Sequence, residues 1–128
     1  LAPSAAAPGV RIQAFELQRT DVPGVFRYKV MVSRVGNESD TVEARLYISV
    51  HGRQGDSRVQ HSLAELTGGR TQYLTLNFRY FQVVPDSEGA ELMLPLGFEP
   101  ETVQLKVENE GKVLLEQTVE WTDTGPRP

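Results

Sequence analysis

The chain has 128 residues, of which 39% are hydrophobic and 23% charged, and its formal net charge is −4. This length suits one domain that hides about two thirds of its unfolded surface, and the composition is that of a globular protein rather than a disordered one. The chain lacks the basic patch that a nucleic-acid partner would require. It has no cysteine, which excludes a disulfide framework, a thiolate zinc site and a cysteine nucleophile.

The two ends differ in composition from the rest of the chain. Residues 1–9 are rich in Ala, Pro and Ser and read as a linker, residues 10–122 as one domain and residues 123–128 as a flexible tail. No apolar run approaches the roughly 20 residues that cross a bilayer. The start has neither Met nor the charged flank of a signal peptide. We therefore expect a soluble domain excised from a longer protein.

Period-two alternation of apolar and polar residues dominates the core of the chain and predicts strands with one wet face. The run from Val10 to Leu17 changes phase midway, which predicts a bulged edge strand. Two clearer strands follow at 26–33 and 42–50, with Met31 and Tyr47 on their polar faces. Further runs at 74–80, 91–94, 103–107 and 113–121 predict later strands.

Short turns rich in Gly, Pro and Asn separate these runs and favour antiparallel hairpins. Ser62 and Glu65 form a capping box that predicts one helical turn. We therefore predict an all-β fold, an antiparallel Ig-like sandwich of two sheets with about seven to eight strands; a small closed barrel is the alternative. The expected inter-sheet core comprises Phe26, Tyr28, Leu46, Ile48, Leu76, Phe78, Leu105, Val119 and Trp121.

The segment from Leu94 to Pro100 is expected to be a rigid crossing between strands. Its two prolines cannot sit inside a central ladder, and Gly97 between them can reverse the chain. A strand should end near Leu94 and resume near Thr102, with Leu96 and Phe98 pointing inward as a plug. The alternative displays Phe98 to a partner.

Candidate chemistry is sparse. His51 and His61 border one turn and could meet across a hairpin, but the spacing places no third metal ligand, so we expect no metal site. The acidic residues lack the offsets of a calcium loop, and no motif of an activated nucleophile occurs. We therefore expect no catalytic residue, no cofactor and no enzymatic activity.

One strand face combines aromatic residues with arginine. Tyr73, Arg79 and Phe81 are expected on the side opposite Leu74, Leu76, Phe78 and Tyr80, and are the candidate partner-binding residues. Such residues are enriched at interfaces, and a row of rings can also stack on saccharides. In the structural alternative, a bulge near Arg79 turns Phe81 into the core and leaves Tyr73 as an ordinary cross-strand neighbour.

Several short motifs carry a family resemblance. They are Leu63-Ala64-Glu65-Leu66, Phe78-Arg79-Tyr80-Phe81-Gln82, the segment Leu94–Pro100 followed by Val103 and Val107, and the ending Val119-Glu120-Trp121. Together they resemble the C-terminal domain of an uncharacterised family of proteobacterial envelope proteins. The resemblance implies a single-pass inner-membrane protein with a coiled coil and this domain in the periplasm, often encoded beside a bactofilin.

From the missing catalytic motifs and this resemblance we expect a non-catalytic periplasmic protein-interaction module of a membrane-anchored cell-envelope protein, linked to cell shape or wall organisation. Its expected partner is another envelope protein. The missing coiled coil would supply any oligomer, and the missing anchor would supply the membrane contact. The alternative is a carbohydrate- or peptidoglycan-binding module that uses Tyr73, Arg79 and Phe81 as a stacking platform. A hydrolase is the third hypothesis.

Overall fold

The computed structural model describes residues 9–36 and 40–126. The predicted linker, apart from Gly9, lies outside the described residues. The elements, in chain order, are β1 (Gly9–Arg19), β2 (Val25–Val35), β3 (Val42–Gln54), β4 (Ser57–Ser62), α2 (Leu63–Leu66), β5 (Leu74–Phe78), β6 (Phe81–Val84), β7 (Glu91–Met93), β8 (Phe98–Asn109) and β9 (Lys112–Glu120). None of the described helices is long and apolar enough to cross a membrane.

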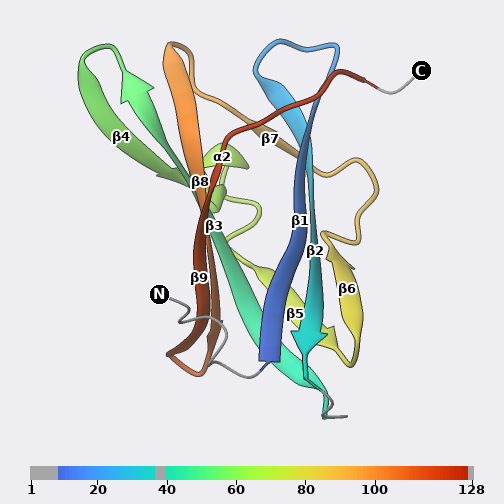
Figure 1. Cartoon of the computed structure of the whole chain (residues 1–128). Coiled ribbons are helices and arrows are strands. Elements are labelled where there is room, and N and C mark those ends of the chain that lie inside the picture. The colour runs from blue at the N-terminus through green and yellow to red at the C-terminus, as the bar shows by residue number, and fades with distance from the viewer. Residues whose placement is uncertain (1–8, 37–39, 127–128) are drawn as a thin grey trace.

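The strands form two antiparallel sheets that pack face to face (Figure 1). Sheet A has the order β1-β2-β6, with β7 also paired to β2, and sheet B has the order β4-β3-β8-β9, with β5 also paired to β3. The predicted β-sandwich is confirmed, with nine strands among the described residues. The extra strands come from the β3–β4 hairpin and from the short β6.

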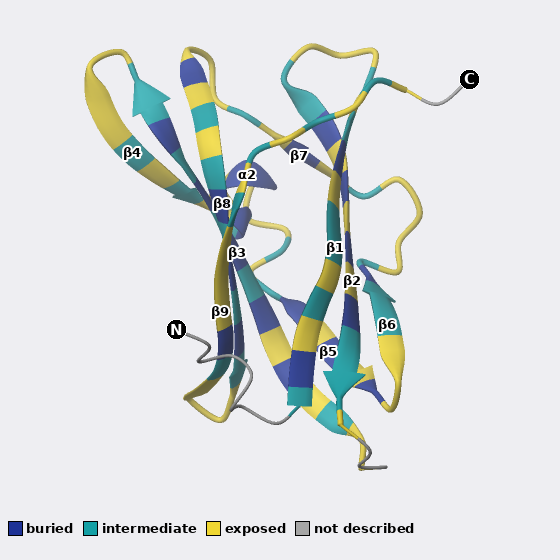
Figure 2. Ribbon diagram, viewed as in Figure 1, coloured by how far each residue is buried: buried dark blue, intermediate teal, exposed yellow. Residues whose placement is uncertain are grey.

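The core lies between the sheets, where the dark bands of the strands face each other in Figure 2. Alternate residues of β2 and β3 are buried, as their apolar spacing predicts. Val30, Leu46 and Leu105 are fully buried at its centre. Two predicted members lie at the margin, because Val119 and Trp121 are only partly buried and pack against the rest.

The first strand carries the predicted bulge. The register of β1 against β2 shifts between Ile12 and Ala14. β1 is an edge strand of sheet A, as expected. The extra residue keeps Ile12 and Phe15 in contact with the core and explains the change of phase in the sequence.

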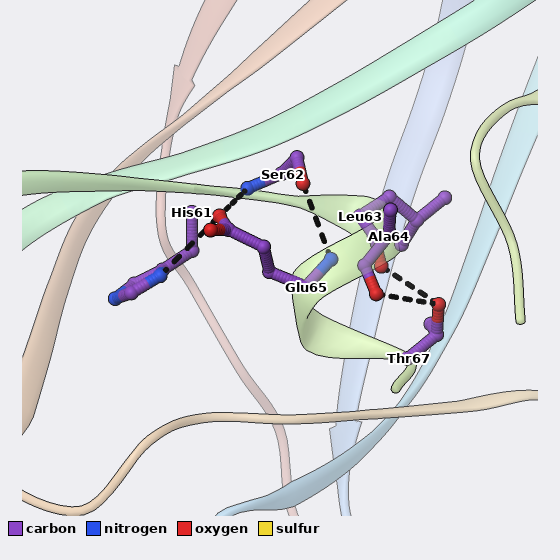
Figure 3. A network of polar contacts seen from close by, with 6 residues as sticks. All are labelled: His61, Ser62, Leu63, Ala64, Glu65 and Thr67. Carbon is purple, nitrogen blue, oxygen red and sulfur yellow. Dashed lines mark hydrogen bonds and ion pairs between the residues drawn. The ribbon is translucent and has the colours of Figure 1, made fainter. Parts of the chain in front are cut away.

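The predicted capping box is present at α2, a single helical turn that lies between the layers (Figure 1). The Ser62 side chain accepts from the Glu65 amide at 3.1 Å, and the Ser62 amide donates to the Glu65 carboxylate at 2.8 Å (Figure 3). The Thr67 hydroxyl donates to the Leu63 carbonyl at 2.8 Å and closes the other end. Leu63 and Leu66 are buried, so this turn fills one end of the core.

The crossing after β7 differs in part from the prediction. Phe98 is buried, but Leu96 is 97% exposed, so its predicted inward position is wrong. The Phe98 amide donates to the Pro95 carbonyl at 3.1 Å, and Gly97 has a φ of 80°. In this tight turn Leu96 is the first of the two central residues, so its side chain points outward.

The next strand begins earlier than predicted. β8 starts at Phe98 rather than near Thr102, so it includes Pro100. Pro100 lies opposite Gly52, where the register of β3 against β8 shifts. A proline is tolerated in this inner strand because the irregularity removes the need for its amide proton.

The first part of the predicted tail, residues 123–126, lies within the described chain and contacts β1. Thr124 pairs in parallel with Gln18 of β1. Its amide donates to the Leu17 carbonyl at 3.0 Å, and its carbonyl accepts from the Arg19 amide at 2.7 Å. The segment after β9 therefore crosses from sheet B to sheet A, as the red trace in Figure 1 shows, and extends the edge of β1.

Candidate functional surfaces

The three predicted partner-binding residues do not form one row. Tyr73 directly precedes β5 in sheet B, whereas Phe81 begins β6 in sheet A. The chain changes sheets between Phe78 and Phe81, so the alternation that links them in sequence does not continue in space. Arg79 is exposed in the turn between the strands, and its carbonyl accepts from the Arg34 guanidinium at 2.9 Å.

The alternative position of Phe81 and the expected side of Tyr80 are also corrected. Phe81 is 66% exposed, so no bulge turns it into the core. Tyr80, expected on the inner side, is 64% exposed. The Tyr80 carbonyl accepts from the Arg34 amide at 3.1 Å, which holds the turn against β2. The rings of Tyr80 and Phe81 both remain exposed to solvent.

Phe81 belongs to an apolar surface on the outer face of sheet A. Met31 is 38% exposed and lies between Ala14 of β1 and Val83 of β6. Phe81 pairs with Ser33, which is two residues beyond Met31 on the same face of β2. We call Ala14, Met31, Phe81 and Val83 the outer patch. It spans three adjacent strands, whose other face supplies the core.

The sequence contained a signal for this patch. Met31 occupies a position that alternation assigns to the wet face of β2, and it gains significance only if other apolar residues lie beside it. Its neighbours, however, come from β1 and β6, which are separated from it by long stretches of chain. Their proximity follows from strand order, which alternation within one strand cannot reveal.

Tyr73 belongs to a different surface, a groove of about 460 Å³ on the outer face of sheet B. Its ring lies 5.7 Å from that of Tyr47, with the planes tilted by 48°. The Arg45 guanidinium lies 4.3 Å from the centre of the Tyr73 ring. These residues form the tyrosine groove, which combines ring surface with charge.

An ion pair lies beside this groove. The Lys106 ammonium lies 3.1 Å from the Glu108 carboxylate and 5.7 Å from the centre of the Tyr47 ring. Hydrogen bonding to Glu108 raises the pKa of Lys106, and contact with the Tyr47 side chain raises the pKa of Arg45. Both cations therefore stay charged over the whole physiological range. Because Arg45 covers one face of Tyr73, the flat surface available for stacking is reduced.

The two histidines lie on opposite faces of the β3–β4 hairpin. His51 pairs with Gln60, and His61 pairs with the buried Val50. Residues paired across antiparallel strands point to the same side, so His61 faces inward and His51 outward. Within the described residues, no three potential ligands come together to hold a metal ion.

Comparison with known proteins gives a family match. Residues 1–105 match the sequence model of the Family of unknown function (DUF6776). No curated protein sequence matches the chain.

Proposed function

Because the chain belongs to the family of unknown function DUF6776, we propose a role from its surface chemistry: a non-catalytic module that binds another protein. We further propose that a membrane-anchored envelope protein carries it in the periplasm, in an assembly that organises the wall beside a bactofilin. The sequence resemblance supports this location. Fractionation of cells that produce the natural protein tests it, and recovery of the domain in the cytosol would contradict it.

The outer patch is the observation that carries protein binding. Phe81 is 66% exposed, and its outward-facing neighbours on sheet A include Val83 in the same strand, Met31 on β2 and Ala14 on β1. Aromatic residues and methionine are enriched at protein interfaces, and contiguous apolar surface is uncommon on a monomer unless a partner covers it. The patch lies on backbone that is already paired into sheet A, so a partner would bind it with little ordering cost.

Substitution within the patch tests this role. The intact protein is used to capture partners from envelope extract, alongside the variants Phe81→Ser and Val113→Ser. Val113 is the matched control, because it is a 47% exposed apolar residue on β9 of the other sheet. We expect a reproducible partner whose recovery falls at least tenfold with Phe81→Ser and stays unchanged with Val113→Ser. Failure of the intact protein to capture any partner would contradict the proposal.

Saccharide binding at the tyrosine groove is the second candidate. The two tyrosine rings, with Arg45 and Lys106 beside them, supply both apolar surface and hydrogen-bond donors. Co-sedimentation with peptidoglycan fragments tests it. Binding that Tyr73→Ala abolishes and Phe81→Ser leaves intact would support this role, whereas absence of binding to any fragment would remove it.

A further inference from the structure

Within the part of the chain that the structure describes, the free edge of β1 has no partner over most of its length. β1 pairs with β2 on one side. On the other side, Thr124 bonds the backbone of Leu17 and Arg19. Among the described residues, none pairs with this edge between Val10 and Glu16. An unpaired edge of this length is a template for another strand.

The backbone groups on this edge can be assigned from Thr124. The Leu17 carbonyl accepts from the Thr124 amide, so Leu17, whose side chain is buried, directs its backbone toward the free edge. Along a strand, the side-chain face and the direction of the backbone groups alternate together. Ile12 and Phe15 share the inward face with Leu17. They therefore also direct their N–H and C=O groups toward the free edge.

The side chains of β1 are complementary to a second copy of the same strand. If two copies run antiparallel with Gln13 opposite Ala14, Ile12 lies opposite Phe15 and Arg11 lies opposite Glu16. The bulge between Ile12 and Ala14 of one copy then lies opposite the same bulge of the other copy. Inward-facing residues of one strand therefore stay opposite inward-facing residues of the other. Each pair occurs twice by symmetry, as an isologous interface requires.

The charges of this register are only partly matched within one copy, because Glu16 lies opposite Lys29 of β2 whereas Arg11 lies opposite the uncharged Ser33. Arg11 and Glu16 are exposed on the outer face of sheet A, and neither forms an ion pair with another described residue. Opposite charges directly across strands stabilise pairing, and like charges disfavour it. A shift of two residues would place Arg11 opposite Gln18 or Ala14, so this register is the one that pairs the charges.

The apolar seam beside the edge supports the same arrangement. Ile12 and Phe15 are only partly buried and line a groove of about 350 Å³ between β1 and β9. A second β1 would place its own Phe15 and Ile12 beside them. It would thereby cover apolar surface that one copy leaves partly open.

We propose that this protein forms a two-fold symmetric dimer in which β1 pairs antiparallel with β1 of a second copy, with Arg11 of each opposite Glu16 of the other. The free N–H and C=O groups of Ile12 and Phe15 supply the central hydrogen bonds. The segment at Thr124 limits the ladder to the region before Leu17. This interface lies at the β1 edge, so it leaves Phe81 and Val83 of the outer patch free for a different partner.

A charge exchange tests the register. Sedimentation equilibrium of the intact chain over a wide concentration range should show a species of twice the 14.2 kDa chain mass. Arg11→Glu should shift the equilibrium toward monomer at least tenfold, and the double variant Arg11→Glu/Glu16→Arg should restore it. Lys112→Glu, the same charge change on β9, should have no effect. A monomer at every concentration, or a dimer unaffected by Arg11→Glu, would overturn the proposal.

Disulfide trapping gives an independent answer if an exchange variant fails to fold, since the chain has no cysteine of its own. Arg11→Cys/Glu16→Cys should yield a covalent dimer under mild oxidation. Within one strand the two positions are about 16 Å apart, too far for an internal disulfide. Arg11→Cys/Gln18→Cys, which is out of register, should stay monomeric on a non-reducing gel. Equal cross-linking of both variants, or of neither, would contradict the register.

Discussion

The imidazole of His61 stands edge-on to the ring of Phe98, with ring centroids 4.9 Å apart and an angle of 84° between the planes. The contact joins the end of β4 to the first residue of β8. His61 also lies 3.5 Å from the Glu65 carboxylate of the capping box (Figure 3). Phe98 therefore closes the end of the core where α2 begins.

Replacing Phe98 by Ala should destabilise the protein by about 3–5 kcal/mol, because a buried ring is lost and a cavity remains. Leu96→Ala is the matched control in the same turn and should leave the free energy of unfolding within about 0.5 kcal/mol, since Leu96 is 97% exposed. Urea unfolding followed by far-UV circular dichroism measures both. Equal losses in the two variants would contradict this assignment of inside and outside.

Trp121 should contribute less than a fully buried tryptophan. Its ring makes an edge contact with Phe26, with centroids 5.1 Å apart, and its indole N–H donates to Asp123 at 2.8 Å. We expect Trp121→Ala to cost about 2–3 kcal/mol. Asp123→Ala, which also breaks the exposed ion pair with Arg19, should cost about 1 kcal/mol or less. An unchanged melting temperature in Trp121→Ala would contradict packing of the indole against the core.

The capping box should weaken in acid. The hydrogen bond from the Ser62 amide, reinforced by His61, lowers the pKa of Glu65. A lowered carboxyl pKa contributes stability that is fully present above the unfolded value of about 4.3 and is lost as pH falls through the folded value. The stability difference between the wild type and Glu65→Gln should therefore shrink from pH 6 to pH 3. The same substitution at Glu43, on β3, is the control, and an undiminished difference at pH 3 would contradict the prediction.

Gly52 should not tolerate a side chain. A Cβ atom there would lie 2.0 Å from the Glu99 carbonyl oxygen and 2.9 Å from the Pro100 Cα. Both are backbone atoms of β8, so neither can move aside without disturbing the strand. Gly52→Ala should destabilise the protein by about 1–3 kcal/mol. Ser49→Ala in the same strand is the control, and thermal unfolding distinguishes them; a stable Gly52→Ala variant would mean that the two strands lie further apart.

Local patterns were sufficient to predict most elements. The alternation from Val42 to Val50, the change of phase in β1 and the capping box at Ser62 each depend on residues close together in the chain. Their physical causes, which are side-chain direction in a strand, an inserted residue and satisfaction of helix amides, act over a few residues. These predictions could be made without knowing which strands are neighbours.

The candidate surfaces could not be predicted in the same way. Extending one alternation from Tyr73 to Phe81 assumed a single strand, whereas the turn at Arg79 and Tyr80 moves the chain from sheet B to sheet A. Tyr73 then meets Tyr47 and Arg45, and Phe81 lies near Met31. The predicted inward position of Leu96 was wrong for a related reason, because a tight turn rather than strand phase decides the direction of its side chain.

The sequence by itself determined that this protein is an all-β sandwich with a bulged first strand and one capped helical turn, because alternation and capping are local properties. Tertiary structure decided which strands are neighbours, where the outer patch and the tyrosine groove form, and which edge of β1 stays open. Those features join residues far apart in the chain, such as Ala14 with Met31 and Val83. They depend on which strands are adjacent in each sheet, and that order is the one that buries the inner faces of both sheets against each other.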